Sequence, residues 1–256
     1  MWSKNGESFL PHTLQRIEQV VPHEQIGQKI FVDDHSTDNS SRIAKDFNWR
    51  VLNSPYYGIG YAANLALEHV KTENFISIEQ DILLAKNWFE VIPESMEQEN
   101  VMVAEGIRIP TNPILRTLEQ YANINRNERF HVSIDNNIYK TEALRVVGGF
   151  PVECFTCTDQ ILYEIITRHG EWVINNTVVS DHIRPSVFEY YSKQIRMSDL
   201  CSRTPNCPSY NADLKVLFRI FLTSFGRGLL MSLKTKCPHM FWVYPLDRLA
   251  TLRACI

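Results

Sequence analysis

The sequence has no uninterrupted apolar run of roughly 18 residues or more, the length that a membrane-spanning helix requires. The first residues, MWSKNGESFL, also lack the apolar core of a secretory signal. We therefore expect a cytoplasmic protein. Because that compartment keeps thiols reduced, we expect the six unevenly spaced cysteines to form no disulfide framework.

The chain has no overall basic field, since 26 Lys and Arg stand against 29 Asp and Glu, for a net charge of −3. This balance argues against a dedicated nucleic-acid-binding protein. The charge is uneven, however: residues 201–256 hold eight basic and two acidic residues, against 18 and 27 in the rest. A basic tail on an acidic body indicates contact with an anionic surface, or simply a solvated face.

Short apolar runs alternate with helical patterns along residues 1–200, which is typical of βαβ units and a mainly parallel sheet. A 256-residue chain has room for one such α/β domain with an appendage. We predict strands at 29–32, 49–52, 75–78 and 101–104, and helices at about 10–21, 60–70 and 158–169.

The appendage, residues 201–256, is predicted to be a basic amphipathic helical region. From Asp213 to Leu233 the sequence is rich in Leu, Phe and Ile, and at 100° per residue four cations fall within a sector of about 120°. These are Lys215, Arg219, Arg227 and Lys234. We expect residues 213–236 either to rest on a membrane surface or to cover the sheet with their apolar side.

Acidic residues follow two of the predicted strands. Val32-Asp33-Asp34-His35-Ser36-Thr37-Asp38 begins where open α/β sheets bind ligands, although Ser36 or Asp38 could simply cap the next helix. Glu79-Gln80-Asp81 follows the strand at 75–78, and two carboxylates at this spacing can reach one hard cation such as Mg²⁺ or Mn²⁺.

These segments together resemble family 2 glycosyltransferases, which have the GT-A fold, a Rossmann-like mixed sheet flanked by helices. Residues 32–38 look like the V-D-D-x-S-x-D motif, and residues 58–64 like G-x-G-x-A-R-N. Residues 78–88 resemble the L-D-x-D segment with its later Trp, and residues 158–162 take the place of E-D-x-x-L. The resemblance covers about residues 5–195, with the motifs in the expected order.

The resemblance implies an inverting enzyme that moves a sugar from a nucleoside-diphosphate sugar to a hydroxyl acceptor, either a glycan or a lipid-linked molecule. Asp159 would be the general base, or else only a helix cap. A Mn²⁺ or Mg²⁺ ion would be held by Glu79, Asp81 and His182. The donor would be bound by Asp33, Asp34, Ser36, Gly58, Gly60, Asn64 and Gln80.

Several residues depart from the family pattern. Glu79 replaces the usual Asp, Ala63 stands where Arg is usual, and Thr158 replaces the Glu before Asp159. The family also has a strand before the first helix, which we expect to be missing or cut short here. These departures keep open a second hypothesis, a catalytically degenerate binding or scaffold protein, although Asp81 and Asp159 are retained.

A third hypothesis is dinucleotide binding, because residues 58–63 fit G-x-G-x-x-A with Glu79 about 20 residues beyond. That fingerprint should directly follow its strand, whereas residues 53–57 intervene here. We therefore favour glycosyl transfer.

Overall fold

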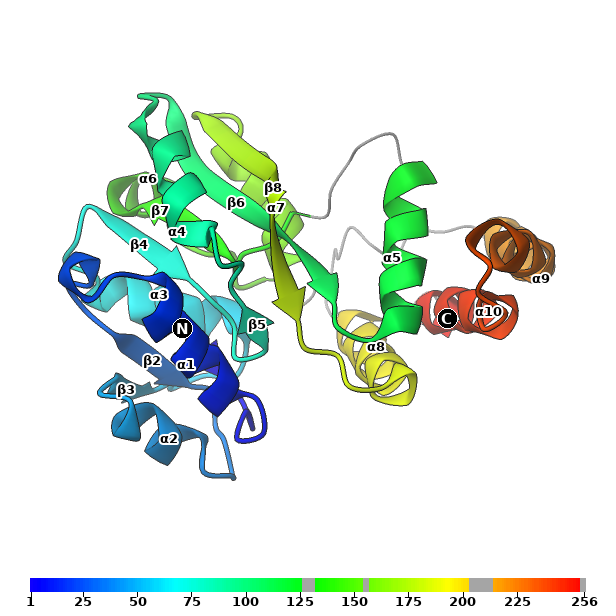
Figure 1. The fold of residues 1–256 in the computed structure, drawn as a ribbon, viewed down its shortest axis with the longest axis horizontal. Helices are drawn as coiled ribbons and strands as arrows, with labels where there is room; N and C mark the ends of the chain where they lie inside the picture. Colours follow the sequence, from blue (N-terminus) through cyan, green and yellow to red (C-terminus); the bar gives the residue numbers. More distant parts are fainter. Residues whose placement is uncertain (126–131, 154–156, 203–213, 254–256) are drawn as a thin grey trace. The chain divides into compact units, whose positions relative to one another are not determined.

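The structure is a computed structural model that describes residues 1–125, 132–153, 157–202 and 214–253. The chain divides into two compact units, shown as ribbons in Figure 1. Unit 1 comprises residues 1–109, 131–153 and 158–183, and unit 2 comprises residues 110–130, 154–157 and 184–256.

Unit 1 is built on two sets of strands. β1 (Trp2–Ser3), β2 (Ile30–Asp33) and β3 (Arg50–Asn53) are parallel and lie in the order β1-β2-β3. The second set has the order β4-β7-β6-β8-β5, with antiparallel pairing of β4 with β7, β6 with β7 and β5 with β8. These strands are β4 (Asn74–Ser77), β5 (Ile82–Leu83), β6 (Val101–Pro110), β7 (Asn137–Lys140) and β8 (Glu171–His182).

Helices cover both faces of these strands. Adjacent strand residues point to opposite sides, so each face carries apolar side chains for the helices to cover. Phe31 packs in one apolar cluster, whereas its neighbours Ile30 and Val32 pack in the other. The first cluster includes side chains of α1 (Leu10–Val20), α2 (Ser40–Asp46) and α4 (Trp88–Val91). The second includes those of α3 (Ile59–His69), α6 (Thr141–Val146) and α7 (Thr158–Ile166). Two 3₁₀ turns, His23–Gln25 and Pro93–Glu97, complete unit 1.

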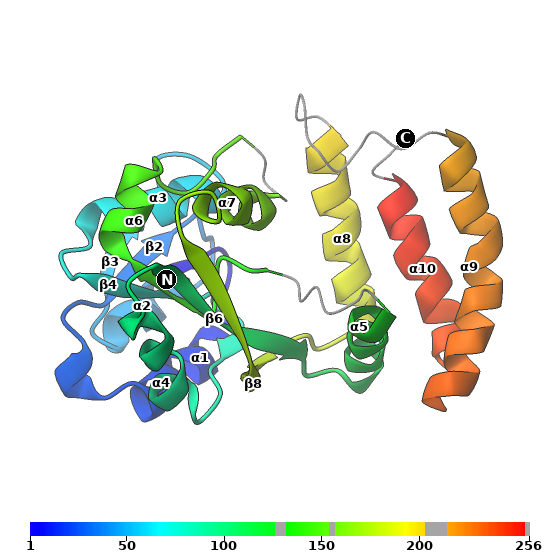
Figure 2. The same cartoon turned by 90° about the horizontal axis from the view of Figure 1, so that it is seen from above.

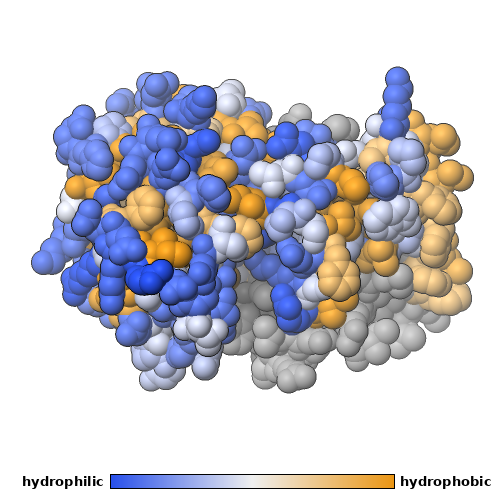
Figure 3. Space-filling model, turned by 60° about the horizontal axis from the view of Figure 1, so that its bottom comes forward, coloured by the Kyte–Doolittle hydropathy of each residue, from blue (hydrophilic) through white to orange (hydrophobic). Residues whose placement is uncertain are grey.

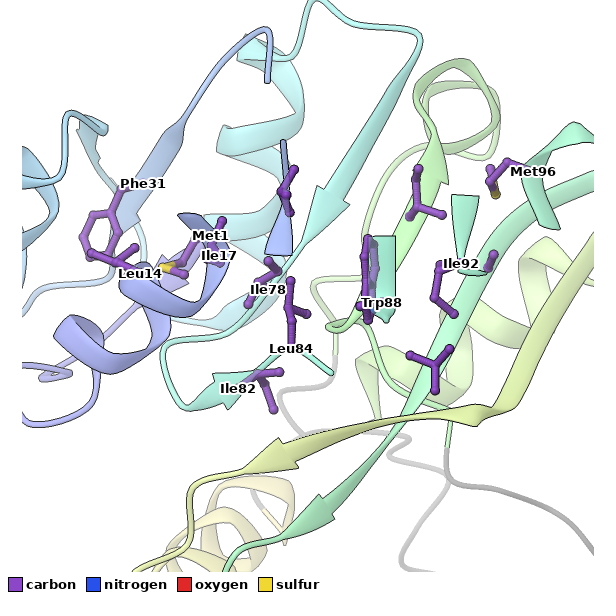
Figure 4. Packing of buried hydrophobic residues seen from close by; sticks show 14 of the residues in the cluster. Met1, Leu14, Ile17, Phe31, Ile78, Ile82, Leu84, Trp88, Ile92 and Met96 are labelled. Atoms are coloured by element: carbon purple, nitrogen blue, oxygen red, sulfur yellow. The ribbon is translucent and has the colours of Figure 1, made fainter. Parts of the chain in front are cut away.

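Trp88 lies inside the first cluster and is fully buried, as expected of a core residue rather than a ligand-stacking one. Figure 4 shows it between Leu84 and Ile92, with Leu14 and Phe31 further along the same layer. Its indole nitrogen donates to the Asn136 carbonyl at 3.4 Å. The indole therefore fills the core and satisfies its polar atom there.

The described residues of unit 2 form four helices: α5 (Pro113–Asn125), α8 (Val187–Ser202), α9 (Leu214–Thr235) and α10 (Met240–Arg253). Figure 2 shows α9 and α10 running alongside each other. The four helices share an apolar core, which is made of Leu118, Tyr191, Met231, Met240, Val243 and Tyr244. Within the described ranges, no helix is both long and apolar enough to span a bilayer.

The predicted elements agree closely with these bounds, including the helix predicted after residue 213. Several features were not predicted, among them the short β1, the long strand β8 and the helices α8 and α10. The expected mainly parallel sheet is also wrong for the second set of strands, where β4–β7, β6–β7 and β5–β8 pair antiparallel. Residues 113–125 form α5, although no pattern was recognised there. The predicted boundary at residue 200 falls within α8, whose Tyr191 packs in the core of unit 2.

Candidate functional site

The two acidic segments lie at the same edge of the strands, on either side of β1. Trp2 and Ser3 pair with Val32 and Asp33 of β2, and Trp2 also forms a parallel bridge to Glu79, just after β4. Two strand spacings amount to about 10 Å, which a nucleoside diphosphate can span. The strand that we expected to be missing or cut short is present as the two-residue β1. β1 lies between the two acidic strands, so they are not direct neighbours.

Asp33 organises the loop after β2. Its carboxylate accepts hydrogen bonds from the backbone N–H of Ser36, at 2.8 Å, and from the Ser41 hydroxyl. The residue is buried, with 9% of its surface exposed. The Asp33 carboxylate thus shapes the loop from within, while the Ser36 hydroxyl accepts a hydrogen bond from the backbone N–H of Asn5 at 3.0 Å.

Asp34 connects this loop to the start of α3. Its two carboxylate oxygens lie 3.3 and 3.2 Å from the donating backbone N–H of Gly58, and its Oδ1 lies 3.3 Å from His35 Nδ1. Gly58 has φ 121° and ψ 152°, a conformation open essentially to glycine alone. The glycine is needed here so that its amide can face the carboxylate.

An aromatic group beside Asp34 was not predicted from the sequence. The ring of Tyr57 stacks on His35 with centroids 3.8 Å apart, and Lys4 Nζ lies 4.6 Å from its centre. Tyr57 is 60% exposed. The sequence feature that could have indicated this group is the pair Tyr56-Tyr57, directly before the glycine motif. An exposed aromatic ring beside a carboxylate suits contact with a planar base.

Gly60 and Asn64 hold the segment after α6. The Asn64 side chain donates to the Phe150 carbonyl at 2.8 Å and accepts from the Phe150 N–H at 2.7 Å. A Cβ on Gly60 would lie 2.2 Å from the Pro151 carbonyl oxygen. Both residues were predicted to touch the donor; the contacts in the structure are with the protein's own backbone.

Gln80 and Glu79 are tied to β1. Gln80 Oε1 accepts from the Ser3 hydroxyl at 2.5 Å and from the Lys4 N–H at 2.9 Å. Glu79 Oε1 lies 3.4 Å from the Trp2 indole nitrogen, which donates to it. These contacts fasten the Glu79-Gln80-Asp81 turn to the strand that lies between the two acidic segments.

Asp81 and His182 form a buried pair. The antiparallel register of β5 and β8 puts Ile82 opposite His182, and Asp81 Oδ2 lies 3.4 Å from His182 Nε2. The backbone N–H of Ile183 also donates to the Asp81 carbonyl at 2.8 Å. The structure thus brings together two of the three predicted metal ligands, which are far apart in the sequence.

This pair fits a divalent cation. A carboxylate is the hard oxygen ligand that Mg²⁺ and Mn²⁺ prefer, and an imidazole favours a transition metal, so the set suits Mn²⁺. In the part of the chain that is described, no three His, Cys, Asp or Glu side chains form a metal-holding group. The third predicted ligand, Glu79, accepts a hydrogen bond from the Trp2 indole through Oε1, and its role as a metal ligand stays a prediction.

Asp159 lies in the first turn of α7 and has a raised pKa. Burial is the main cause; the Gln160 N–H, which donates to Oδ1 at 2.9 Å, and the nearby Arg108 lower the pKa by less. A carboxylate with a raised pKa is a better proton acceptor near neutral pH than an ordinary aspartate. A raised pKa would suit the predicted general base, and the helix-cap alternative shares the same position.

Arg108 on β6 is the cation around which the acidic groups gather. Burial lowers its pKa, but four carboxylates more than reverse this effect, and the pKa lies above its ordinary value. They belong to Asp135, Glu79, Glu105 and Asp159. The guanidinium Nη1 lies 2.6 Å from both carboxylate oxygens of Asp135, which is fully buried.

Three charged residues of this group were not predicted from the sequence: Arg108, Asp135 and Glu105. Glu105 is buried on β6, accepts a hydrogen bond from the Trp172 indole at 2.7 Å, and has a pKa raised well above its ordinary value, chiefly by burial. The available signal was two charged residues, Glu105 and Arg108, within the otherwise apolar run of a central strand. Charged residues in such a run are rarely buried unless they are paired.

A cavity of about 440 Å³ lies elsewhere in unit 1. Its lining includes Met1, Lys29, Ile30 and Asn74, at the amino ends of β2 and β4. The acidic segments follow the carboxyl ends of the same strands. None of the predicted site residues lines this cavity.

Comparison with known proteins agrees with this architecture. The profile of glycosyl transferase family 2 matches residues 1–157. No curated protein sequence matches the chain. Among solved structures, a mannosyltransferase from Pyrobaculum calidifontis in complex with GDP-Man and Mn²⁺ has a TM-score of 0.63 at 16% identity, covering 99% of this chain and 72% of that one.

Two further structures are similar in fold. TarS from S. aureus in complex with UDP-GlcNAc has a TM-score of 0.57 at 12% identity, covering 98% of this chain and 88% of that one. Glucosyl-3-phosphoglycerate synthase from Mycobacterium tuberculosis, with Mn²⁺, UDP-Glc and phosphoglyceric acid, has a TM-score of 0.55 at 16% identity, covering 78% and 77%. The predicted GT-A fold is confirmed.

Proposed function

Because the chain belongs to glycosyl transferase family 2, we propose that it transfers a sugar from a nucleoside-diphosphate sugar to an acceptor hydroxyl, with inversion at the anomeric carbon. One observation carries the proposal. The buried Asp81–His182 pair lies at the same sheet edge as the Asp33-Asp34 loop, with β1 between them. A diphosphate held at the pair can extend its nucleoside toward the loop.

The structural neighbours support the donor class. Three of them are described with GDP-Man, UDP-GlcNAc or UDP-Glc, and two also with Mn²⁺. We therefore propose a hexose derivative as the transferred group and Mn²⁺, or else Mg²⁺, as the cofactor. The acceptor hydroxyl belongs to a glycan or a lipid-linked molecule in this proposal.

Each residue has a proposed role. Asp81 and His182 hold the cation together with the diphosphate oxygens, since such ions are commonly shared between one or two protein ligands and substrate phosphates. When bound, the cation offsets the negative charge that develops on the leaving diphosphate. Asp34 and Tyr57 receive the nucleoside, in the loop that Asp33 and Gly58 shape.

Asp159 takes the proton of the acceptor hydroxyl as that oxygen attacks the anomeric carbon. The proton moves to the Asp159 carboxylate, the new bond forms to the sugar, and the nucleoside diphosphate leaves from the opposite face. Arg108 supports this role by attracting the ionised Asp159 carboxylate. It is a positioning residue, because its own guanidinium is engaged by Asp135.

The test is calorimetric binding of UDP and GDP with and without Mn²⁺, followed by measurement of nucleoside diphosphate released from UDP- and GDP-sugars. We expect Mn²⁺ to tighten binding in the wild type, and Asp81→Asn to weaken the metal-dependent binding at least about tenfold, as loss of a metal-site residue does. Asp46→Asn, at an exposed position in α2, is the matched control and should behave as wild type.

Equal nucleotide affinity with and without Mn²⁺, in both the wild type and Asp81→Asn, would contradict the proposed metal site. Metal-dependent donor binding without any sugar release or transfer would instead favour the degenerate binding protein.

A further inference from the structure

The outward side of α9 carries an exposed apolar row. Phe218, Leu222, Phe225, Leu229 and Leu233 follow one another at intervals of three or four residues, so they share one face of the helix. We call these five residues the apolar stripe. Their exposed fractions range from 46% to 70%. Figure 3 shows apolar surface gathered at the right of the view, where the helices of unit 2 lie.

The stripe is distinct from the face that builds the core of unit 2. Met231 is fully buried and Ser224 almost so, and both lie on the side of α9 away from Leu222. Gly228 lies on this inner side too, where an added Cβ would meet the Phe241 carbonyl oxygen of α10 at 2.9 Å. Because α10 packs on the inner side of α9, the stripe takes no part in the core of unit 2 and remains on the surface.

Cations lie on one side of the stripe, between it and the inner face of α9. At 100° per residue, Arg219, Lys234 and Arg227 lie about 60°, 120° and 140° from Leu222, and all three are exposed. No acidic residue occurs between 214 and 246, whereas that segment holds five Lys and Arg. Trp242, at the start of α10, is 43% exposed and adds an aromatic side chain of the kind enriched at lipid–water boundaries.

We propose that α9 lies in the surface of a lipid bilayer with anionic headgroups. The apolar stripe enters the acyl boundary while Arg219, Arg227 and Lys234 reach the headgroups. The apolar stripe would contact the acyl chains, and the cations, which have no acidic residue in their segment, would contact the lipid phosphates. A second copy of the chain fits less well, because two stripes packed together would bring their bordering cations near each other without any acidic partner in the segment.

The test is co-sedimentation of the full chain with vesicles of phosphatidylcholine alone and of equal parts phosphatidylcholine and phosphatidylglycerol. We expect binding to the anionic vesicles that falls as salt is raised, since salt screens surface charge. Arg227→Glu with Lys234→Glu should reduce the partition coefficient at least about tenfold. Arg168→Glu with Lys71→Glu makes the same charge change at exposed positions of unit 1, and should reduce it far less.

The stripe is tested separately with Leu222→Gln, Leu229→Gln and Leu233→Gln combined, since glutamine keeps helix propensity. Val146→Gln, at a 72% exposed position of α6, is its control. Circular dichroism establishes that each variant is folded. Wild-type partitioning by the triple variant, equal binding to both vesicle types, or a dimer that the triple variant converts to monomer would each overturn the proposal. None of these outcomes bears on nucleotide binding at Asp81, so the two proposals fail independently.

Discussion

Several charged residues in unit 1 are buried, and their neighbours determine how far burial destabilises the charged form of each side chain. Asp135 has no exposed surface, and the Arg108 guanidinium offsets its charge at 2.6 Å. For Glu105 the effect of burial outweighs that of Arg108, and its pKa is raised well above the ordinary value. Asp159 lies between these cases, since burial raises its pKa while Arg108 counteracts part of the effect.

Asp159→Asn tests the residue proposed as the base. General-base assistance is typically worth about 10²–10⁴ in rate, so the variant should lose most turnover while still binding UDP with Mn²⁺. In the wild type, kcat/KM should rise with pH through the raised pKa of Asp159, which lies above the ordinary value of about 3.9. The measurement is a pH profile of nucleoside diphosphate release.

Thermal unfolding tests the raised pKa of Asp159 itself, whereas the loss of turnover tests its catalytic role. A carboxyl whose pKa is raised on folding makes the folded state less favourable as pH rises from the unfolded pKa through the folded one. Asparagine cannot ionise, so the Tm of Asp159→Asn minus that of wild type should be larger at pH 7 than at pH 4. Near-wild-type turnover in the variant would place the base elsewhere.

Among the elements, α3 does most to position the site, through its first turn. Gly58 presents its amide to Asp34, and Gly60 lets the helix approach the backbone at Pro151. Asn64, one turn further, holds Phe150 by two hydrogen bonds. The helix thus joins the loop after β2 to the segment that precedes α7 and its Asp159.

Gly60→Ala should separate α3 from that segment. The new Cβ would lie 2.2 Å from a backbone oxygen, which cannot move aside as a flexible side chain can. We expect a loss of about 1–3 kcal/mol in unfolding free energy, as for other overpacked sites. Urea denaturation gives the value.

Gly226→Ala is the matched control for this substitution. Gly226 is also helical, in α9, but a Cβ there would meet nothing within 4 Å. Alanine should therefore stabilise the protein by up to about 1 kcal/mol through helix propensity. Equal stability changes in the two variants would show that the contact at Pro151 does not constrain α3.

At the scale of the whole molecule, the two units have separate cores. Unit 1 encloses an apolar cluster on each face of its strands, and unit 2 has a cluster of its own. The candidate residues of the nucleotide and metal sites all belong to unit 1. Donor binding should therefore depend on the packing of unit 1 and tolerate defects in unit 2.

Paired core substitutions test this independence. Met231→Ala leaves a cavity in unit 2, and Trp88→Ala leaves one in unit 1 beside β5 and β8; such changes cost about 2–5 kcal/mol. We expect Met231→Ala to keep wild-type affinity for UDP with Mn²⁺ at low temperature, and Trp88→Ala to weaken it. Calorimetry measures both, and equal losses would show that the site depends on both units.

The local sequence was sufficient to predict strands β2, β3, β4 and β6, helices α1, α3, α7 and α9, and the acidic residues at the strand ends. Hydrophobic periodicity and turn residues act within a few positions, so Phe31 and its neighbours are recognisable without the rest of the chain. The GT-A order of motifs was equally visible. The two-residue β1 was not, because so short a segment has no periodicity and is held only by its pairing with β2.

Only the tertiary structure decided which charged groups meet. His182 reaches Asp81 because β8 pairs antiparallel with β5 in one particular register. Glu79 turns to Trp2 because β1 lies beside β4, and Arg108 gathers Asp135 and its other carboxylates across strands that are distant in the chain. Such contacts depend on long-range packing and burial, which no local pattern of residues encodes.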